Sequence, residues 1–322
     1  MSTHSIEVVE VQKEPHPNAD TLSVVKIHGW QCVVRTADWN DGDLAAYIPP
    51  DYVVPEKPEY EFLRDKDGKF HPRIRVRKLR GYISQGLLMP APRGVAVGDN
   101  VIEQMGITRY VPPEPATMGG DCASPPTSVW HNKHYDVEAH QRFNLVIQPG
   151  ENVVVTEKIH GANARVVHTE GELWVGSRTT WKKRDEKNIF WKAVIQNPWV
   201  EPLARKLPDH IFYGEVFGNV QDLKYGAQKN QYFIRFFDVL YKSEWLSYTE
   251  QQIIFEDDQY VPILYTGPYI EEVIIGLENG PSKIEGANHI REGIVIRPVI
   301  ERQDPELGRV QVKRVSNEYL LR

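Results

Sequence analysis

The stretch from Asn152 to Asn163 reads NVVVTEKIHGAN, and the interpretation of the second half of the chain depends on it. The run from Val153 to Val155 is apolar and β-branched, which is typical of a buried strand. Lys158 follows at the end of that strand beside a glycine turn, where a nucleophile could sit. A lysine at a turn is more often an ordinary surface residue, so the surrounding sequence has to decide between the two.

Length and composition limit the possible classes of protein. The 322 residues suffice for about two domains, and 41% hydrophobic with 25% charged residues is ordinary for a globular chain with a sizeable core. The 38 basic and 44 acidic residues give a formal charge of −6. This balance excludes a uniformly basic protein that coats nucleic acid, but it does not exclude a local basic patch.

The cysteines and the N-terminus bear on the cellular compartment. Cys32 and Cys122 have no Cys-x-x-Cys spacing, so the sequence predicts neither a zinc site nor a disulfide framework, and a reducing compartment fits. The first residues, MSTHSIE, lack the apolar core of a signal peptide, and no run has the length of a membrane span. We expect a cytoplasmic protein without a membrane partner.

The first part of the chain, residues 1–110, reads as β-structure. Segments 6–11 and 22–27 alternate apolar and polar residues, and further short strands are expected near 32–35, 45–48 and 86–89. Such spacing indicates a small barrel. Residues 111–129, rich in Pro, Gly and Ser, are predicted to form a linker.

The second part, residues 130–322, combines segments of helical periodicity with segments of strand periodicity. Residues 188–206 have helical spacing interrupted by Pro198 and Pro202. Strands are expected at 152–156, 211–216, 232–238, 293–297 and 309–313. This pattern predicts an α+β domain.

A basic stretch lies in the first domain. If residues 73–77 form a strand, Arg73, Arg75 and Arg77 project from one face, and such a stripe suits the phosphates of a nucleic acid. A solvated strand face is the plainer alternative for a charge run.

Two segments of this domain resemble the oligonucleotide-binding (OB) barrel appended to some aminoacyl-tRNA synthetases. They are HPNAD at 16–20, before a strand, and RGYISQGL at 80–87, in which Leu87 replaces the family's methionine. The resemblance spans most of residues 6–92 and implies a barrel that faces RNA. It leaves open whether aromatic residues of the barrel stack on bases or belong to its core. These are Trp30, Trp39, Tyr47 and Tyr82.

In the second domain, EKIHGAN at 157–163 resembles motif I of the covalent nucleotidyltransferases, in the Lys-x-His-Gly-x-Asn form of RNA ligases. Five further motifs follow in the family's order: VGSRT at 175–179 (Ia), FYGEVFG at 212–218 (III), RFFDV at 235–239 (IIIa), REGIVIR at 291–297 (IV) and RVQVK at 309–313 (V). Each motif is weak alone, but six in order are specific. The whole chain therefore resembles ATP-dependent RNA ligases with an N-terminal OB-fold domain and a C-terminal nucleotidyltransferase domain of antiparallel sheets flanked by helices.

The resemblance implies roles for single residues. Lys158 would carry AMP, with Lys313, Glu215 and Glu292 as further catalytic residues. Glu292 and Glu215 would hold Mg²⁺ or Mn²⁺, since carboxylates suit hard cations. The nucleotide would be bound by Glu157, Ile159, Asn163, Arg178, Glu215, Phe237, Arg297 and Lys313.

The chemistry is consistent with these residue types. A lysine that attacks the α-phosphate must be unprotonated, and nearby cations such as Lys313 and Arg178 favour that form. Phe237 would stack on adenine while Phe236 points the other way, and Glu157 would lie near the adenine edge.

Plainer interpretations stay open for several residues. Phe237 could be core packing, and Glu215 and Glu292 could form structural ion pairs. His160 is expected to orient its neighbours rather than act as an acid or base. We expect His131, His134 and His140 to be scattered surface residues and not a metal cluster.

The sequence departs from the family in two respects. Gln311 stands where motif V usually has its first lysine, so either Lys313 would act with less help or Arg309 or Arg297 would compensate. The chain ends nine residues after Lys313, without the barrel that follows motif V in DNA ligases and capping enzymes. Nothing resembles the extra domains of NAD-dependent ligases either, which favours ATP.

We therefore predict a monomeric ATP-dependent RNA ligase that forms lysyl-AMP, adenylylates a 5′-phosphate and seals it to a 3′-OH. The predicted substrate is a nick with RNA on the 3′-OH side. Two alternatives are a DNA-joining or capping nucleotidyltransferase and a non-catalytic RNA- or tRNA-binding protein on a ligase scaffold.

Overall fold

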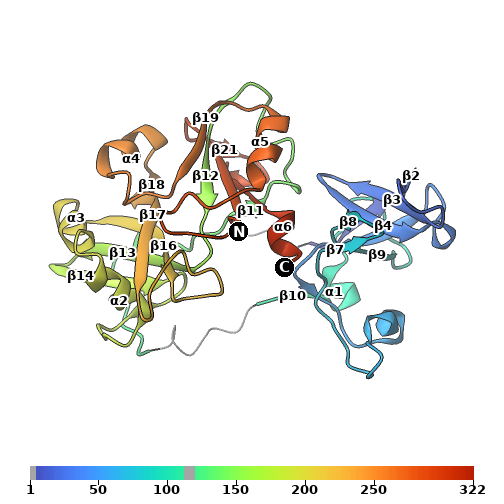
Figure 1. Cartoon of the computed structure of the whole chain (residues 1–322), viewed down its shortest axis with the longest axis horizontal. Coiled ribbons are helices and arrows are strands. Elements are labelled where there is room, and N and C mark those ends of the chain that lie inside the picture. The colour runs from blue at the N-terminus through green and yellow to red at the C-terminus, as the bar shows by residue number, and fades with distance from the viewer. Residues whose placement is uncertain (1–4, 112–119) are drawn as a thin grey trace. The chain divides into compact units, whose positions relative to one another are not determined.

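The computed structural model describes residues 5–111 and 120–322, and these fall into two compact units. The first contains residues 5–111, 140–144 and 320–322, and the second contains 120–139 and 145–319 (Figure 1). Of the predicted linker, residues 112–119 lie outside the described residues. The part that follows belongs to the second unit, because the Ala123 N–H donates to the Trp181 carbonyl and the Lys183 N–H to the Asp121 carbonyl.

The first unit is built from short antiparallel strands. One sheet has the order β1-β5-β9 and another β2-β3-β4, and two strand pairs, β6-β10 and β7-β8, complete the unit. The strands are β1 Glu7–Glu10, β2 Lys13–Pro15, β3 Leu22–Ile27, β4 Trp30–Arg35, β5 Leu44–Ile48, β6 Tyr52–Val53, β7 Arg77–Leu79, β8 Tyr82–Ser84, β9 Leu87–Pro90 and β10 Thr108–Arg109, with one short helix, α1 Ile102–Met105.

The alternation of residues along these strands creates the core of this unit. Val8, Ala46 and Met89 lie side by side on β1, β5 and β9 and are buried, as the period-2 pattern predicts. Tyr47 is buried and its hydroxyl donates to the Gln85 carbonyl. Of the aromatic residues whose role the sequence left open, Tyr47 is therefore a core residue.

The second unit contains two larger sheets. A five-stranded sheet has the order β11-β23-β20-β12-β19, and a six-stranded sheet has the order β15-β14-β13-β16-β17-β18. Their strands are β11 Glu138–Ala139, β12 Asn152–Lys158, β13 Ala162–Thr169, β14 Glu172–Ser177, β15 Trp181–Lys182, β16 His210–Gly218, β17 Tyr232–Tyr241, β18 Glu244–Trp245, β19 Ile263–Pro268, β20 Gly293–Pro298 and β23 Val312–Val315, and a further hairpin pairs β21 Gln303–Asp304 with β22 Gly308–Arg309.

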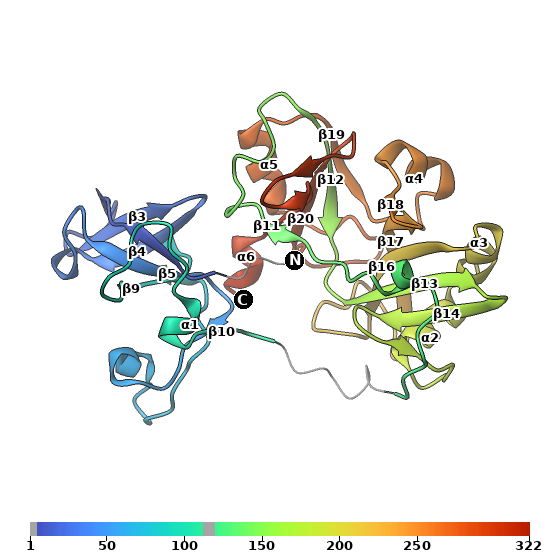
Figure 2. The same cartoon turned by 180° about the vertical axis from the view of Figure 1, so that it is seen from behind.

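Few helices accompany these sheets. Helices α2 and α3 pack on the six-stranded sheet, α2 against β14, β16 and β17 and α3 against β13 and β14 (Figure 2). The helices are α2 Ile189–Gln196, α3 Val200–Lys206, α4 Tyr248–Ile254, α5 Glu271–Glu278 and α6 Asn317–Leu320. The α+β prediction is confirmed.

Several local predictions differ from the structure. The helix expected at 188–206 is two helices, because the chain breaks before Pro198, a residue that cannot donate a backbone hydrogen bond. The strand expected at 309–313 is interrupted between β22 and β23. His131 and His140 are buried, so the prediction that they are surface residues is wrong.

Within the described residues, no helix is long and apolar enough to cross a membrane.

Candidate functional site

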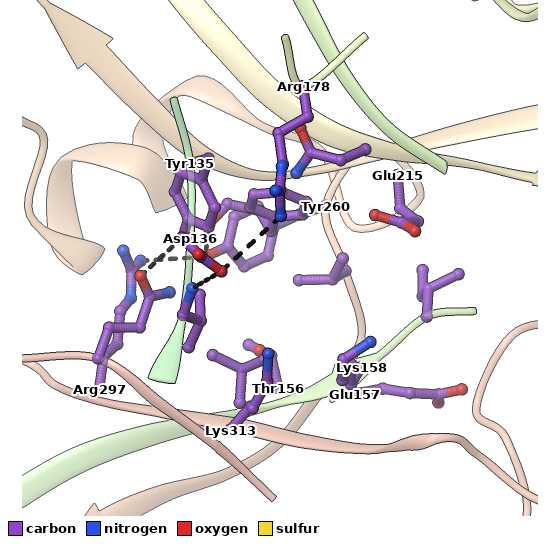
Figure 3. A pocket seen from close by; sticks show the side chains of 17 residues that line it. Tyr135, Asp136, Thr156, Glu157, Lys158, Arg178, Glu215, Tyr260, Arg297 and Lys313 are labelled. Carbon is purple, nitrogen blue, oxygen red and sulfur yellow. Dashed lines mark hydrogen bonds and ion pairs between the residues drawn. The ribbon is translucent and has the colours of Figure 1, made fainter. Parts of the chain in front are cut away.

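A pocket lies where the two sheets of the second unit approach each other, and residues from all six motifs line it or contact its lining (Figure 3). Lys158 projects from the end of β12, which lies between β19 and β20 in the five-stranded sheet. The lining residues are Tyr135, Asp136, Val137, Thr156, Glu157, Lys158, Ile159, Asn163, Arg178, Glu215, Phe237, Tyr260, Val261, Val295, Arg297, Gln311 and Lys313.

Glycines allow the chain to pack closely around Lys158. Gly293 on β20 is the strand partner of Lys158, and a Cβ atom on it would lie 2.1 Å from the Arg314 carbonyl oxygen. Gly161, in the turn after Lys158, approaches β16 so closely that a Cβ atom would lie 2.2 Å from the Val216 carbonyl oxygen. Both glycines of the motifs are therefore required by close backbone contact.

The ammonium group of Lys158 is held by carboxylates. Its Nζ atom lies 2.7 Å from Glu292 Oε2. Burial lowers the pKa of Lys158, but the charges of Glu292 and Glu215 outweigh burial and raise it above its ordinary value. The carboxylates thus favour the charged form of Lys158.

The two carboxylates themselves differ in pKa. Burial raises the pKa of Glu292, but the charge of Lys158 and the hydrogen bond from His160 prevail and lower it to about 2. Burial raises the pKa of Glu215 to about 8, with Lys158 acting in the opposite direction. The charge of Glu292 is thus balanced by Lys158, whereas Glu215 lacks sufficient positive charge around it.

The oxygen atoms near Lys158 fit a hard divalent cation. Asn163 and Glu215 face each other on β13 and β16, and the buried Oδ1 atom of Asn163 has no hydrogen-bond partner. Among the described residues, no three His, Cys, Asp or Glu side chains form a ready-made metal cluster. The set Glu215, Glu292 and Asn163 suits Mg²⁺ or Mn²⁺, which are often held by one or two carboxylates together with water and phosphate oxygens.

Aromatic rings form another wall of the pocket. Phe237 faces the pocket, whereas Phe236 is fully buried in the core, as the alternation of β17 predicts. The Tyr135 ring packs against Phe237 with 4.8 Å between the ring centroids. Phe237 thus offers a face for a planar base and is supported from behind.

A buried ionic network lies beneath this wall, centred on the fully buried Asp238. Its pKa is raised by burial but lowered overall by Arg309 and Arg297. Arg309 also bonds Glu301 at 2.7 Å, and it is absent from the pocket lining. The charge of Arg309 is neutralised within this network. Arg297 contacts Asp238 of the network and also lines the pocket.

Gln311, which replaces the first lysine of motif V, joins the same network. Its side-chain Oε1 atom lies 2.7 Å from the Tyr135 hydroxyl, which also lies 2.7 Å from Asp238 Oδ2. Position 311 therefore supplies a neutral group anchored by Tyr135. Among the two arginines suggested to compensate for it, only Arg297 reaches the pocket.

Glu157 lines the pocket, and its carboxylate has partners in a distant loop. Its carboxylate is buried and accepts hydrogen bonds from the Ser282 hydroxyl and the Lys283 backbone N–H, each at 2.6 Å. Thr156 and Lys158 alternate with it along β12. The Glu157 carboxylate thus ties the end of β12 to the loop at 282–283.

His160 occupies the orienting position expected for it. Its Nε2 atom lies 2.9 Å from Asp222 Oδ1, its Nδ1 atom lies 3.5 Å from Glu292 Oε2, and its backbone N–H donates to the Tyr225 hydroxyl. His160 thereby connects the turn after Lys158 to Glu292.

The arginines expected to bind RNA are not equivalent. Arg73 donates two hydrogen bonds to Asp51, at 2.6 and 2.9 Å, and stacks on Tyr110 at 3.8 Å. Arg75 and Arg77 are exposed, and regular strand geometry begins only at Arg77. Arg73 is thus paired with Asp51, unlike a freely exposed arginine, and RNA contact by the three arginines stays a prediction.

Sequence reasoning missed Tyr135, Asp136 and Tyr260. The first two precede every motif in the chain, and Tyr260 lies between motifs IIIa and IV, so no local pattern marks them. A buried tyrosine among acidic and aromatic partners becomes visible only when the fold brings distant segments together.

With this geometry in place, comparison with known proteins is informative. The model of the RNA ligase family matches residues 151–315, about half of the chain. The chain belongs to the RNA ligase family. An OB-fold domain model matches residues 4–91, which confirms the prediction for the first domain. No curated protein sequence matches the chain.

Solved structures of an RNA ligase resemble the whole chain. Naegleria gruberi RNA ligase with pyrophosphate is 26% identical over 99% of this chain and 98% of that chain, with a TM-score of 0.82. Variants of the same enzyme, one with ATP and Mn and one with AMP and Mn, are each 25% identical with TM-scores of 0.81 and 0.82. They cover 98% of this chain and 97% and 98% of theirs.

The raised pKa of Glu215 gives a testable pH dependence. Because its folded pKa of about 8 exceeds the unfolded value of 4.5, ionisation costs the folded state stability as pH rises between these values. Without divalent metal, Glu215→Gln should therefore gain stability relative to wild type from pH 5 to pH 8, measured by urea unfolding. A stability difference that is constant across this range would contradict the raised pKa.

Proposed function

We propose that this member of the RNA ligase family is an ATP-dependent RNA ligase whose nucleophile is Lys158. The observation that supports this most strongly is the Lys158 ammonium group at 2.7 Å from Glu292, in a pocket that also contains a planar aromatic wall and further cations. A surface lysine would not be placed between two carboxylates at the end of a buried strand.

The proposed reaction has three steps. Lys158 Nζ, once it has lost its proton, attacks the α-phosphorus of ATP, a P–N bond forms and pyrophosphate leaves. A 5′-phosphate of RNA then attacks the same phosphorus, and the lysine is released as AMP passes to the RNA end. Finally a 3′-OH attacks the activated 5′-phosphate, and AMP leaves as the phosphodiester forms.

The cations of the pocket would neutralise the charge of the reacting phosphate. Lys313 on β23 and Arg178 after β14 both line the pocket, and Arg297 borders it. Glu292 and His160 hold Lys158 in place, and Glu215, Glu292 and Asn163 would hold the divalent ion. A bound Mg²⁺ or Mn²⁺ would supply positive charge against the phosphates and these carboxylates.

Base recognition would combine stacking with backbone contacts. Phe237, supported by Tyr135, would stack on adenine. Since the Glu157 carboxylate is occupied by the loop at 282–283, the edge of the base would be read by the backbone at the end of β12.

The RNA substrate is proposed to be a nick with RNA on the 3′-OH side, gripped partly by the first unit. The hairpin β7-β8 has the exposed basic residues Arg77, Lys78 and Arg80. His16 and Asn18 fix it, because His16 Nε2 lies 3.3 Å from the Leu79 carbonyl oxygen and the Asn18 amide donates to that of Arg80. His16 and Asn18 belong to the HPNAD segment, which therefore holds the basic hairpin in place.

Two further proposals concern state and location. A monomer in the cytoplasm is consistent with two free cysteines, one buried and one exposed. DNA joining or capping remains the alternative activity, and a GTP control together with DNA and RNA nicks distinguishes these from RNA ligation.

The nucleophile is tested by Lys158→Ala. This variant should lose all covalent label from α-labelled ATP with Mg²⁺, because no P–N bond can form, yet it should seal a nick that is already adenylylated. The measurement is denaturing electrophoresis of protein and RNA. Label on another lysine of the variant would refute the assignment.

The aromatic wall is tested by a pair of neighbouring variants. Phe237→Ala should raise the ATP concentration needed for half-maximal labelling while the protein stays folded. Phe236→Ala, which empties a buried site, should instead lower the free energy of unfolding by about 3–5 kcal/mol. GTP should label poorly in wild type, and equal labelling by GTP would favour the capping alternative.

The hairpin is tested by replacing Arg77, Lys78 and Arg80 with serine. Nick binding should weaken, and the slope of log K against log salt should fall by about 2 to 3, since fewer counterions are released. Adenylylation should be unaffected. Arg73→Gln serves as the matched control, since Asp51 already neutralises Arg73, and an unchanged slope in the triple variant would contradict RNA contact by the hairpin.

A further inference from the structure

An acidic residue stands at the rim of the phosphate-binding pocket. Asp136, which precedes β11, faces Arg178 from the turn after β14, with 3.9 Å between Asp136 Oδ1 and Arg178 Nη1 (Figure 3). The side chains of Asp136 and Arg178 are 32% and 52% exposed. The pair thus spans the rim of the pocket and is accessible to solvent.

The position of Asp136 is defined by the backbone of the residues that follow it. Its Oδ1 atom accepts a hydrogen bond from the Val137 N–H at 3.1 Å, and β11 then pairs with β23, where Ala139 lies opposite Lys313. The carboxylate is therefore held at the pocket by the same segment that borders the motif V strand.

A carboxylate is an unusual group for this place. Lys158, Arg178, Arg297 and Lys313 make the pocket suitable for an anion. Two other acidic residues near these cations bond them closely, since Glu292 bonds Lys158 and Asp238 bonds Arg297. Asp136 instead opposes any phosphate that approaches Arg178.

The pair is weak enough to be displaced. An exposed ion pair at 3.9 Å contributes little, whereas a phosphate accepts two parallel, charge-assisted hydrogen bonds from a guanidinium group. A phosphate that enters can therefore take Arg178 from Asp136, and Asp136 can take it back when the phosphate leaves.

We propose that Asp136 is an internal competitor for the phosphate that Arg178 binds, and that it sets the affinity of the pocket rim for phosphate. The inference rests on the proposed function in that the phosphate belongs either to ATP or to the 5′ end of RNA. Asp136 is then a specificity-determining residue, which limits binding at the rim and favours release.

The test is equilibrium binding without chemistry. ATP binding to the full chain is measured in EDTA, so that no lysyl-AMP forms, for wild type and Asp136→Asn. Losing the competitor should tighten binding about two- to fivefold, the range that corresponds to one exposed ion pair. Combined with Arg178→Gln, Asp136→Asn should have a clearly smaller effect, since the two residues act on each other.

A matched control separates competition from net charge. Asp121→Asn removes the same charge from another exposed pair, Asp121 with Lys183 at 3.5 Å, whose residues do not line the pocket. This variant should bind ATP as wild type does. Equal effects of the two variants would overturn the proposal, because a general charge effect would then explain both.

A second arm identifies the source of the phosphate. Short RNA with a 5′-phosphate is compared with the same RNA bearing a 5′-OH, again in EDTA. Tighter ATP binding by Asp136→Asn assigns the rim to the nucleotide, and a gain limited to the 5′-phosphorylated RNA assigns it to the RNA end.

If Asp136→Asn binds both ATP and 5′-phosphorylated RNA no more tightly than wild type does, the proposal is overturned. Asp136 would then be a spectator or a direct ligand contact. Labelling of wild type by ATP with Mg²⁺ is recorded separately. If labelling fails, the proposed function fails, whereas the two binding arms still decide the role of Asp136.

Discussion

The geometry of the site depends on one ion pair, between the half-buried Lys158 and the buried Glu292, with Glu215 close enough to add to its field. A charged lysine at the end of a buried strand loses much of its hydration, and carboxylates have to replace it. The pair therefore fixes Lys158 in the pocket and at the same time keeps it protonated. In the proposed reaction, the charge balance around Nζ would have to change before Lys158 could attack phosphorus.

The surrounding fold is arranged so that this pair can exist. β12 brings Lys158 to the pocket, β20 brings Glu292 and β16 brings Glu215, and glycines at 161 and 293 allow the backbones to meet. The Asp238 network supports the opposite wall. Asp238 pairs with Arg309 and accepts a hydrogen bond from Tyr135, whose ring packs against Phe237. Basic side chains thus have two roles. Arg309 stabilises the domain, and the cations that line the pocket would face the phosphate.

Local patterns in the sequence predicted much of this arrangement. The alternation along β17 correctly separated Phe237 from Phe236. The ligase motifs contain Lys158, Glu215 and Lys313, which line one pocket, and Glu292, which bonds Lys158. Patterns of spacing cannot show what a side chain meets across the fold. Glu157 therefore turned out to bond a loop 125 residues further along the chain, and Arg73 turned out to be neutralised by Asp51. Tyr135 and Asp136 lie in no motif, and only tertiary structure brings them to the pocket.

The central claim is that carboxylates hold Lys158 in its charged form until substrate arrives. The most direct measurement is the titration of the Lys158 side-chain nitrogen by NMR in protein labelled with ¹⁵N-lysine, without nucleotide or metal. The account predicts that Lys158 titrates above 10.5 and that Glu292→Gln lowers its pKa. A neutral Lys158 near pH 8 in the substrate-free protein, or a pKa that ignores the loss of the Glu292 charge, would contradict it.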